Sequence, residues 1–271
     1  MWESIPDIIN EFSVDDNVRV VVMNGAGDKA FVSGADISEF EEKRNTKDQV
    51  RIYDEATSAA NIALLTLEKP LIAMIRGFCI GGGLAIALNA DIRISCELGQ
   101  FGVPAARLGV GYGYKGIKQL MNLVGPSYTK EIFFTGRRFS ASEALQMGLV
   151  NRVVPQDDLQ KTVEGYANTI ADNAPLTVKA SKMAVNEGVK DPDERDLKKI
   201  ESSISACGMR TLSAKKDPPE TGEDGSTARI ATFSPLDCQC SINLPINVDF
   251  PTPGAPVTPR IQDSSEVISL S

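Results

Sequence analysis

Lys69 to Gly116 reads KPLIAMIRGFCIGGGLAIALNADIRISCELGQFGVPAARLGVGYGYKG and carries the local signals that decide the fold. The apolar run Leu71–Ile75 predicts a buried strand, and Leu84–Leu88 continues at helical spacing. Between them, Gly81–Gly83 lets the backbone approach a ligand and leaves the first N–H groups of the helix without helical partners. Such groups bind negative charge, although a tight turn would also explain the glycines. A second glycine turn and a tyrosine-rich turn nearby favour a site.

The composition excludes several classes of function. The chain has 271 residues, of which 42% are hydrophobic, and this is enough for one sizeable core with an appendage. Its net charge of −8 argues against nucleic acid as a principal partner. Because the chain contains no histidine, a Ser-His-Asp or Cys-His nucleophile and a histidine base are excluded. Acid–base chemistry therefore falls to Asp, Glu, Lys, Tyr or Cys, or the reaction relies on backbone donors.

The cysteines and the apolar runs predict where the protein works. No run is long enough to span a bilayer and no signal peptide is visible, so we expect no membrane partner. Five cysteines without a framework spacing suit a reducing compartment, and we expect a cytoplasmic protein. The pair Cys238 and Cys240 can bind a metal or oxidise, but without histidine or a second pair we expect no metal site.

Strand-like and helix-like segments alternate up to about Ala206, which predicts an α/β domain. Val18–Met23 is apolar on both faces except at Arg19, so we expect a central strand. Ser140-Ala-Ser-Glu143 is a capping box that opens a helix, and Pro175 marks the start of another. Further strands are expected at 91–95, 100–102 and 150–154, and helices at 2–12, 38–67, 116–123, 127–134, 157–173, 175–189 and 193–206.

The character of the chain changes at Cys207. Residues 207–271 hold eight of the fifteen prolines, many serines and threonines, and no helical period. We therefore predict a domain over residues 1–206 and a poorly ordered tail over 207–271, in which 241–248 forms an edge strand at most.

Two glycine-containing turns share one design. Each follows a predicted strand; the first is Ser33-Gly34-Ala35-Asp36 and the second is Gly81–Gly83. If backbone N–H groups of the two turns converge on one point, they form an oxyanion hole, which holds an oxygen that becomes negative during a reaction. Spacing along the chain does not show whether they converge.

Three stretches resemble the crotonase family, which is the enoyl-CoA hydratase/isomerase superfamily: KAFVSGADI at 29–37, GFCIGGGLAIALNAD at 77–91 and ALQMGLVNRVVP at 144–155. The resemblance covers about residues 2–206 and implies a spiral of ββα units with a helical C-terminal region. It also implies a homotrimer or a dimer of trimers. The implied substrate is an acyl-CoA thioester, with coenzyme A as part of the substrate and no other cofactor. In such an enzyme the N–H groups of Ala35 and Gly82 would form the oxyanion hole and stabilise a thioester enolate.

Other residues of these motifs receive roles by the same resemblance. Lys29 is expected near the CoA phosphates, although an exposed lysine without a role is an equal alternative. Asp36 is better explained as a cap on the following helix than as a catalytic group. The remaining residues expected to line the substrate are Ser33, Gly34, Ile37, Gly81, Gly83, Ala85 and Ala105.

The sequence departs from the hydratases at both positions that carry their acid–base carboxylates. These enzymes have one glutamate two residues after the glycine triplet, where this chain has Ala85, and another after a proline, where it has Ala105. The two groups that add water across the double bond are therefore absent. The family's chains also begin earlier, with a strand pair, so we expect Val18–Met23 to lack a neighbouring strand on one side.

Tyr112 is the remaining catalytic candidate. It lies in AARLGVGYGYKG at 105–116, with Arg107 and Lys115 nearby. The methylmalonyl-CoA decarboxylase branch has a tyrosine in a similar context, although it has a histidine where Ala35 stands. A phenol can hydrogen-bond a carboxylate or an enolate, and simple packing is the alternative. We therefore expect an acyl-CoA lyase or isomerase, with a malonyl-type decarboxylase and a catalytically silent acyl-CoA-binding subunit as alternatives.

Overall fold

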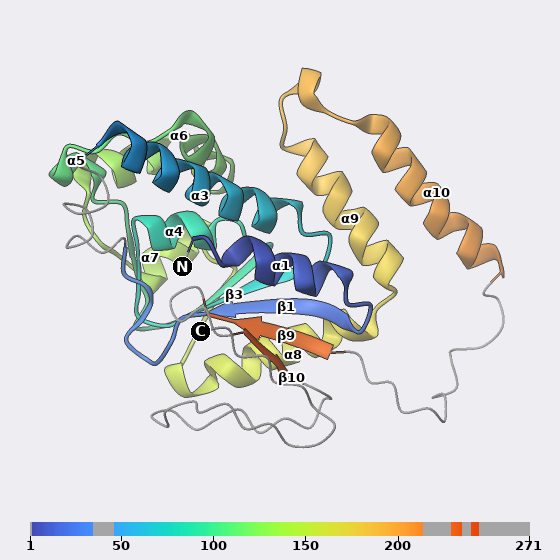
Figure 1. Ribbon diagram of the computed structural model, residues 1–271. Coiled ribbons are helices and arrows are strands. Elements are labelled where there is room, and N and C mark those ends of the chain that lie inside the picture. Colours follow the sequence, from blue (N-terminus) through green and yellow to red (C-terminus); the bar gives the residue numbers. More distant parts are fainter. Residues whose placement is uncertain (1, 35–45, 214–228, 235–239, 244–271) are drawn as a thin grey trace.

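A computed structural model describes residues 2–34, 46–213, 229–234 and 240–243. Its main sheet has six strands in the order β10-β9-β1-β3-β5-β8, and Figure 1 shows the sheet at the centre of the molecule. Every neighbouring pair is parallel except β10 and β9. The strands are β1 (Val18–Asn24), β3 (Leu71–Ile75), β5 (Ile92–Cys96), β8 (Arg152–Val154), β9 (Arg229–Phe233) and β10 (Cys240–Asn243).

A second sheet of four short strands continues the first, in the order β2-β4-β6-β7. Its strands are β2 (Ala30–Val32), β4 (Phe78–Ile80), β6 (Gln100–Gly102) and β7 (Phe139–Ser140), and the first three are parallel. Each of these three directly follows a main-sheet strand, β1, β3 or β5, and a helix comes next along the chain. The expected α/β fold of repeated ββα units is thereby confirmed. The strand β4 was not expected, because it has only three residues, between Gly77 and the glycines of the turn.

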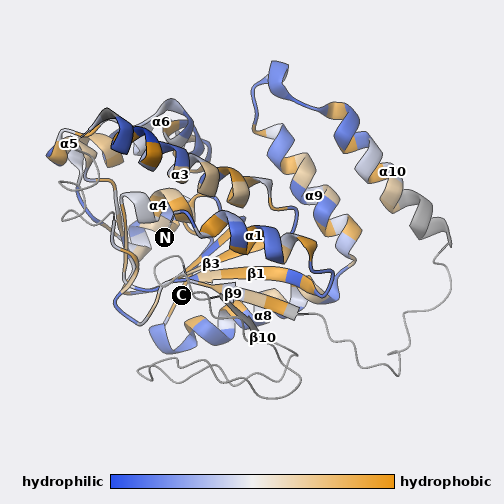
Figure 2. Cartoon of the chain, in the orientation of Figure 1, coloured by the Kyte–Doolittle hydropathy of each residue, from blue (hydrophilic) through white to orange (hydrophobic). Residues whose placement is uncertain are grey.

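The helices α1 (Ile5–Val14), α3 (Lys47–Thr66) and α4 (Gly82–Ala87) lie on one side of the main sheet, and α8 (Leu159–Asp172) lies on the other (Figure 1). In β1, Val21 and Met23 face the first layer while Val20 and Val22 face α8. The expectation of a strand buried on both faces is confirmed. Figure 2 shows the hydrophobic residues concentrated on these central strands and on the helix faces turned toward them.

The remaining helices complete the shell. The segment α6 (Tyr114–Thr135) consists of two helices joined at a kink at Gly125, whose φ of 74° is not helical, and this confirms the two helices expected there. Ser140 and Glu143 form both hydrogen bonds of the predicted capping box. None of the described helices is long and apolar enough to cross a bilayer. The other helices are α5 (Ala105–Leu108), α7 (Ala141–Gln146), η1 (Gln156–Asp158), α9 (Pro175–Gly188), η2 (Pro192–Glu194) and α10 (Leu197–Ser213).

The C-terminal part corrects two expectations. The predicted domain boundary at Ala206 falls inside α10, and β9 and β10 join the main sheet beyond it. The expected gap beside Val18–Met23 is also wrong, because β9 pairs there in parallel with β1. The sequence RIATF forms this strand because Ala231 and Phe233 enter the core next to α1, where Phe233 faces Phe12. The expectation of disorder for the rest of 214–271 lies outside the described residues.

Candidate functional site

The three parallel strands of the second sheet end at the same edge. Their ends lead to Ser33 and Gly34 after β2, to Gly81 and Gly82 after β4, and to Pro104 after β6. The ends of β2 and β4 are close, because a side-chain carbon built on Gly34 would lie 3.7 Å from the carbonyl oxygen of Ile80. The two glycine turns therefore meet. Ala35, Asp36 and Ile37, which follow Gly34 in the sequence, lie outside the described residues.

The second turn presents backbone donors at this edge. Gly81 has a φ of 56°, a conformation that favours glycine, and its N–H donates to the carbonyl oxygen of Gly102 over 2.8 Å. This bond ties the end of β4 to the end of β6. Helix α4 begins at Gly82, so the N–H groups of Gly82 and Gly83 have no carbonyl partner within the helix. Gly82 is partly exposed, which leaves its N–H the better placed of the two to meet a ligand.

Gly83 has a different reason to be glycine. A side-chain carbon there would lie 2.1 Å from the carbonyl oxygen of Val32 in β2, which is closer than atoms can approach. Contact between the backbones of α4 and β2 is therefore possible only without a side chain. The expected substrate contact of Gly83 stays a prediction, because packing already accounts for this residue.

The two alanines expected at the carboxylate positions lie on the segments that follow β4 and β6. Ala85 is partly exposed on α4, and Ala105 is 5% exposed at the first position of α5. A methyl group neither donates nor accepts a proton, so these positions supply no acid or base.

Tyr112 reaches the glycine turn from the segment between α5 and α6. Its hydroxyl oxygen lies 3.8 Å from a side-chain carbon built on Gly81, and its ring makes an edge-to-face contact with Phe133, with ring centres 5.2 Å apart. Burial raises the pKa of the Tyr112 phenol, and the nearby Tyr53 raises it further. The phenol therefore keeps its proton at neutral pH and can act as a hydrogen-bond donor.

Two further residues of this site were not expected from the sequence. Trp2 lies with its ring 3.6 Å from a side-chain carbon built on Gly82, and its indole N–H donates to the hydroxyl oxygen of Tyr53 over 3.1 Å. The sequence placed Trp2 at the start of the helix expected over residues 2–12 and gave Tyr53 no role, whereas α1 begins at Ile5. Nothing local links positions 2, 53 and 82, and only the packing of α3 and the start of the chain against α4 brings them together.

Other residues with expected or alternative roles lie elsewhere. Lys29 is exposed at the start of β2, the end opposite the glycine turn, and its expected contact with CoA phosphates stays a prediction. Arg107 packs against Gly136 at the end of α6. Glu131 forms an ion pair with Arg137 at an N–O distance of 2.8 Å. Glu97 is exposed in the turn before β6, also away from the site edge.

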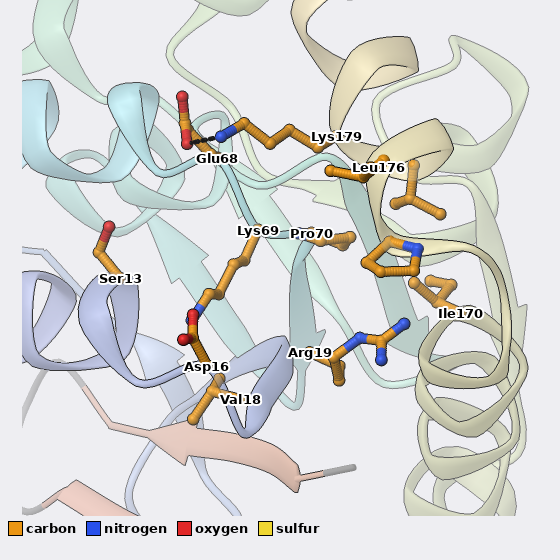
Figure 3. Close-up of a pocket in the computed structure, with 12 residues that line it drawn as sticks. Ser13, Asp16, Val18, Arg19, Glu68, Lys69, Pro70, Ile170, Leu176 and Lys179 are labelled. Carbon is orange, nitrogen blue, oxygen red and sulfur yellow. Dashed lines mark ion pairs between the residues drawn. The ribbon is translucent and has the colours of Figure 1, made fainter. Parts of the chain in front are cut away.

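A separate cleft of about 400 Å³ opens at the opposite end of the main sheet, where β1 and β3 begin (Figure 3). Four of its five charged side chains have hydrogen-bond or ion-pair partners within the protein. Lys179 pairs with Glu68, Arg19 donates to the carbonyl oxygen of Asn173, and Lys69 donates to two carbonyl oxygens at the end of α1. Burial lowers the pKa of Lys69. We therefore place the candidate site at the glycine turn. The cleft is lined by Ser13, Asp16, Val18, Arg19, Glu68, Lys69, Pro70, Ile170, Pro175, Leu176, Val178 and Lys179.

The described part of the chain contains no candidate metal centre. No group of three or more cysteine or acidic side chains is arranged there to hold a metal ion. The thiols of Cys79 and Cys96 are buried in the core, and burial raises the pKa of Cys79 far above its ordinary value.

Known proteins resemble this chain over most of its length. The family model for enoyl-CoA hydratase/isomerase matches residues 1–216. A short-chain-enoyl-CoA hydratase of Clostridium acetobutylicum is 42% identical over 183 residues, which is 68% of this chain and 69% of that protein. A crotonyl-CoA hydratase of Syntrophomonas wolfei is 33% identical over 216 residues, which is 80% of each chain. The crystal structure of an enoyl-CoA hydratase from Bacillus anthracis superposes with a TM-score of 0.70 at 32% identity, covering 79% of this chain and 81% of that one.

Proposed function

This chain belongs to the enoyl-CoA hydratase/isomerase family, and we propose that it acts on acyl-CoA thioesters by stabilising a thioester enolate at the Gly81–Gly82 turn. The observation that carries the proposal is the meeting of two glycine turns at the ends of β2 and β4. The N–H of Gly82 is the described donor, and the N–H of Ala35 is the partner implied by the family. The proposal uses no cofactor besides the coenzyme A of the substrate, and it suits a cytoplasmic enzyme.

Backbone donors suit this chemistry because the charge develops on the thioester oxygen only during the reaction. A donor already fixed at that position stabilises the enolate more than the ground-state carbonyl. Removing one oxyanion-hole donor typically costs about 10²- to 10³-fold in rate.

Ala85 and Ala105 restrict which reaction can proceed through the enolate. Hydration needs a base to activate water and an acid to protonate the α-carbon, and each is typically worth about 10²-fold or more. With methyl groups at both positions we expect hydration to be slower than in a glutamate-bearing relative by roughly four orders of magnitude. Short unsaturated thioesters such as crotonyl-CoA remain the first substrates to test, because two of the relatives are named for them.

Decarboxylation of a malonyl-type thioester is the second candidate, favoured by the position of Tyr112 over Gly81. The bond from the α-carbon to the carboxylate breaks, CO₂ leaves, and the electron pair passes into the thioester enolate. A proton from water then adds to the α-carbon. This sequence needs no carboxylate base, and the neutral Tyr112 phenol can donate a hydrogen bond to the carboxylate or the enolate.

The test compares crotonyl-CoA with methylmalonyl-CoA in the parent protein and in Tyr112→Phe. Tyr166→Phe on α8 is the matched control, because α8 lies on the other side of the main sheet. A hydrogen bond to a charged group is worth about 1.5–3 kcal/mol, so we expect Tyr112→Phe to decarboxylate about 10- to 100-fold more slowly than the parent. Equal rates would remove the role of Tyr112.

The parent protein distinguishes the other outcomes. Hydration as fast as in a glutamate-bearing relative would contradict the argument from Ala85 and Ala105. Tight binding of butyryl-CoA without turnover of either thioester would favour a catalytically silent binding subunit.

We also propose that the protein self-associates, as a homotrimer or a dimer of trimers. The pair α9 and α10 extends from the body of the molecule (Figure 1) and carries exposed apolar side chains. Association would remove these side chains from water. Light scattering on the parent and on Leu197→Glu tests this, and a monomeric parent would contradict it. The exposed side chains are Val185, Val189, Leu197 and Ile204.

A further inference from the structure

Three polar aromatic side chains that are far apart in the sequence gather over the glycine turn. Trp2 precedes α1, Tyr53 lies in α3, and Tyr112 lies between α5 and α6. All three are partly buried. The ring of Trp2 lies 3.6 Å from a side-chain carbon built on Gly82, and the hydroxyl oxygen of Tyr112 lies 3.8 Å from one built on Gly81. In Figure 1, α3 runs along α4, and a hydrogen bond of 2.7 Å from Asn89 to Asn61 joins the segment after α4 to α3.

The hydrogen bond between Trp2 and Tyr53 has a fixed direction. An indole N–H is only a donor, so the hydroxyl oxygen of Tyr53 is the acceptor and its own proton points away from Trp2. Trp2 lies against Gly82 and the Tyr112 hydroxyl lies against the adjacent Gly81, so the Trp2–Tyr53 pair and Tyr112 meet at one turn. Tyr53 also raises the pKa of Tyr112. The ring of Tyr112 packs edge-to-face against Phe133.

We propose that Trp2 and Tyr53 are positioning residues of the acyl-CoA site, and that they hold the Tyr112 hydroxyl over the Gly81–Gly82 turn. This inference rests on the proposed function, because it places a substrate at that turn. Trp2 fixes the orientation of Tyr53, and Tyr53 limits the rotation of Tyr112. The acyl group of the thioester then meets a neutral phenolic donor at the point where the enolate oxygen forms.

The first experiment uses Trp2 as a built-in probe, since it is the one tryptophan of the chain. Emission excited at 295 nm is followed while butyryl-CoA, a saturated thioester that cannot be hydrated, is added to the full chain. Binding is measured in parallel by calorimetry. We expect the change in Trp2 emission during the titration to give the same dissociation constant as calorimetry. Free coenzyme A lacks the acyl group, so we expect it to change the emission less than butyryl-CoA does.

The second experiment measures the phenol directly. Tyrosinate absorbance is titrated in the parent and in Tyr112→Phe, and the difference between the two curves is the titration of Tyr112. The same pair of curves in a Tyr53→Phe background should give a lower pKa for Tyr112, since Tyr53 raises it. Burial continues to raise the pKa, so the value stays above that of an ordinary phenol. Tyr166→Phe is the background control and should leave the difference curve unchanged.

The outcomes separate this inference from the function on which it rests. Loss of the Tyr53 hydroxyl should also weaken butyryl-CoA binding about 2- to 10-fold, the value of one neutral hydrogen bond. Calorimetric binding with unchanged emission, or an unchanged Tyr112 titration in Tyr53→Phe, would overturn the positioning role alone. No binding of butyryl-CoA or crotonyl-CoA would overturn the proposed function, and the inference with it.

Discussion

Replacing Phe233 by alanine should strongly destabilise the protein, although this residue lies in the proline-rich C-terminal region. Phe233 is 1% exposed, and its ring centre is 6.4 Å from that of Phe12 in α1. A buried phenylalanine cut back to alanine typically costs about 3–5 kcal/mol, which is a large part of the 5–15 kcal/mol that holds a domain folded. For a domain of this size, we expect the melting temperature to fall by roughly 6–20 °C.

Urea unfolding followed by circular dichroism measures the change in the free energy of unfolding. Thr232→Val is the control, because it keeps the strand and the shape of the neighbouring side chain, and it should shift the midpoint little. A chain that ends at Ser213 removes β9 and should be destabilised further, whereas a chain that ends at Asn243 retains both strands. If Phe233→Ala unfolds at the same urea concentration and slope as the parent, β9 does not pack on this core and the reasoning fails.

Three further changes test the local structure. Gly83→Ala should destabilise the fold by about 3 kcal/mol or more, because the added carbon would lie 2.1 Å from the Val32 carbonyl oxygen. Gly82→Ala is the control and should melt at the same temperature as the parent, because the added carbon would lie 3.6 Å from its nearest neighbour, the Trp2 ring. Ser140→Ala removes the cap on α7 and should cost about 0.5–2 kcal/mol in urea unfolding. The N–H of Ser140, and then Arg137, lower the pKa of Glu143. The charged Glu143 side chain should therefore stabilise the fold fully above the ordinary glutamate pKa of about 4.3, and this stabilisation should be lost as the pH falls through the lower pKa of the folded state. In Glu143→Gln, urea unfolding should show a weaker dependence on pH in this range.

Local patterns predicted a large part of this fold. Leu71–Ile75 and Gln100–Gly102 form strands with the expected limits, and the helix expected from Pro175 begins there. These predictions succeed because helical spacing, apolar runs, capping residues and glycines act through neighbouring residues. The strand at the C-terminal end was not predicted, because it depends on a distant segment and not on neighbouring residues. The proline content of this region is a property of composition, whereas the strand at Arg229–Phe233 exists because β1 offers it a parallel partner.

The same division applies to the candidate site. The two glycine turns, the methyl groups at Ala85 and Ala105, and the absence of any histidine follow from residue identity alone, so they could be predicted from the sequence. The folded chain was needed to see that the turns meet at one edge of the second sheet, that Tyr112 reaches Gly81, and that Trp2 and Tyr53 join them. Pairing between distant segments depends on which apolar faces bury each other across the whole chain, and no local spacing encodes that choice.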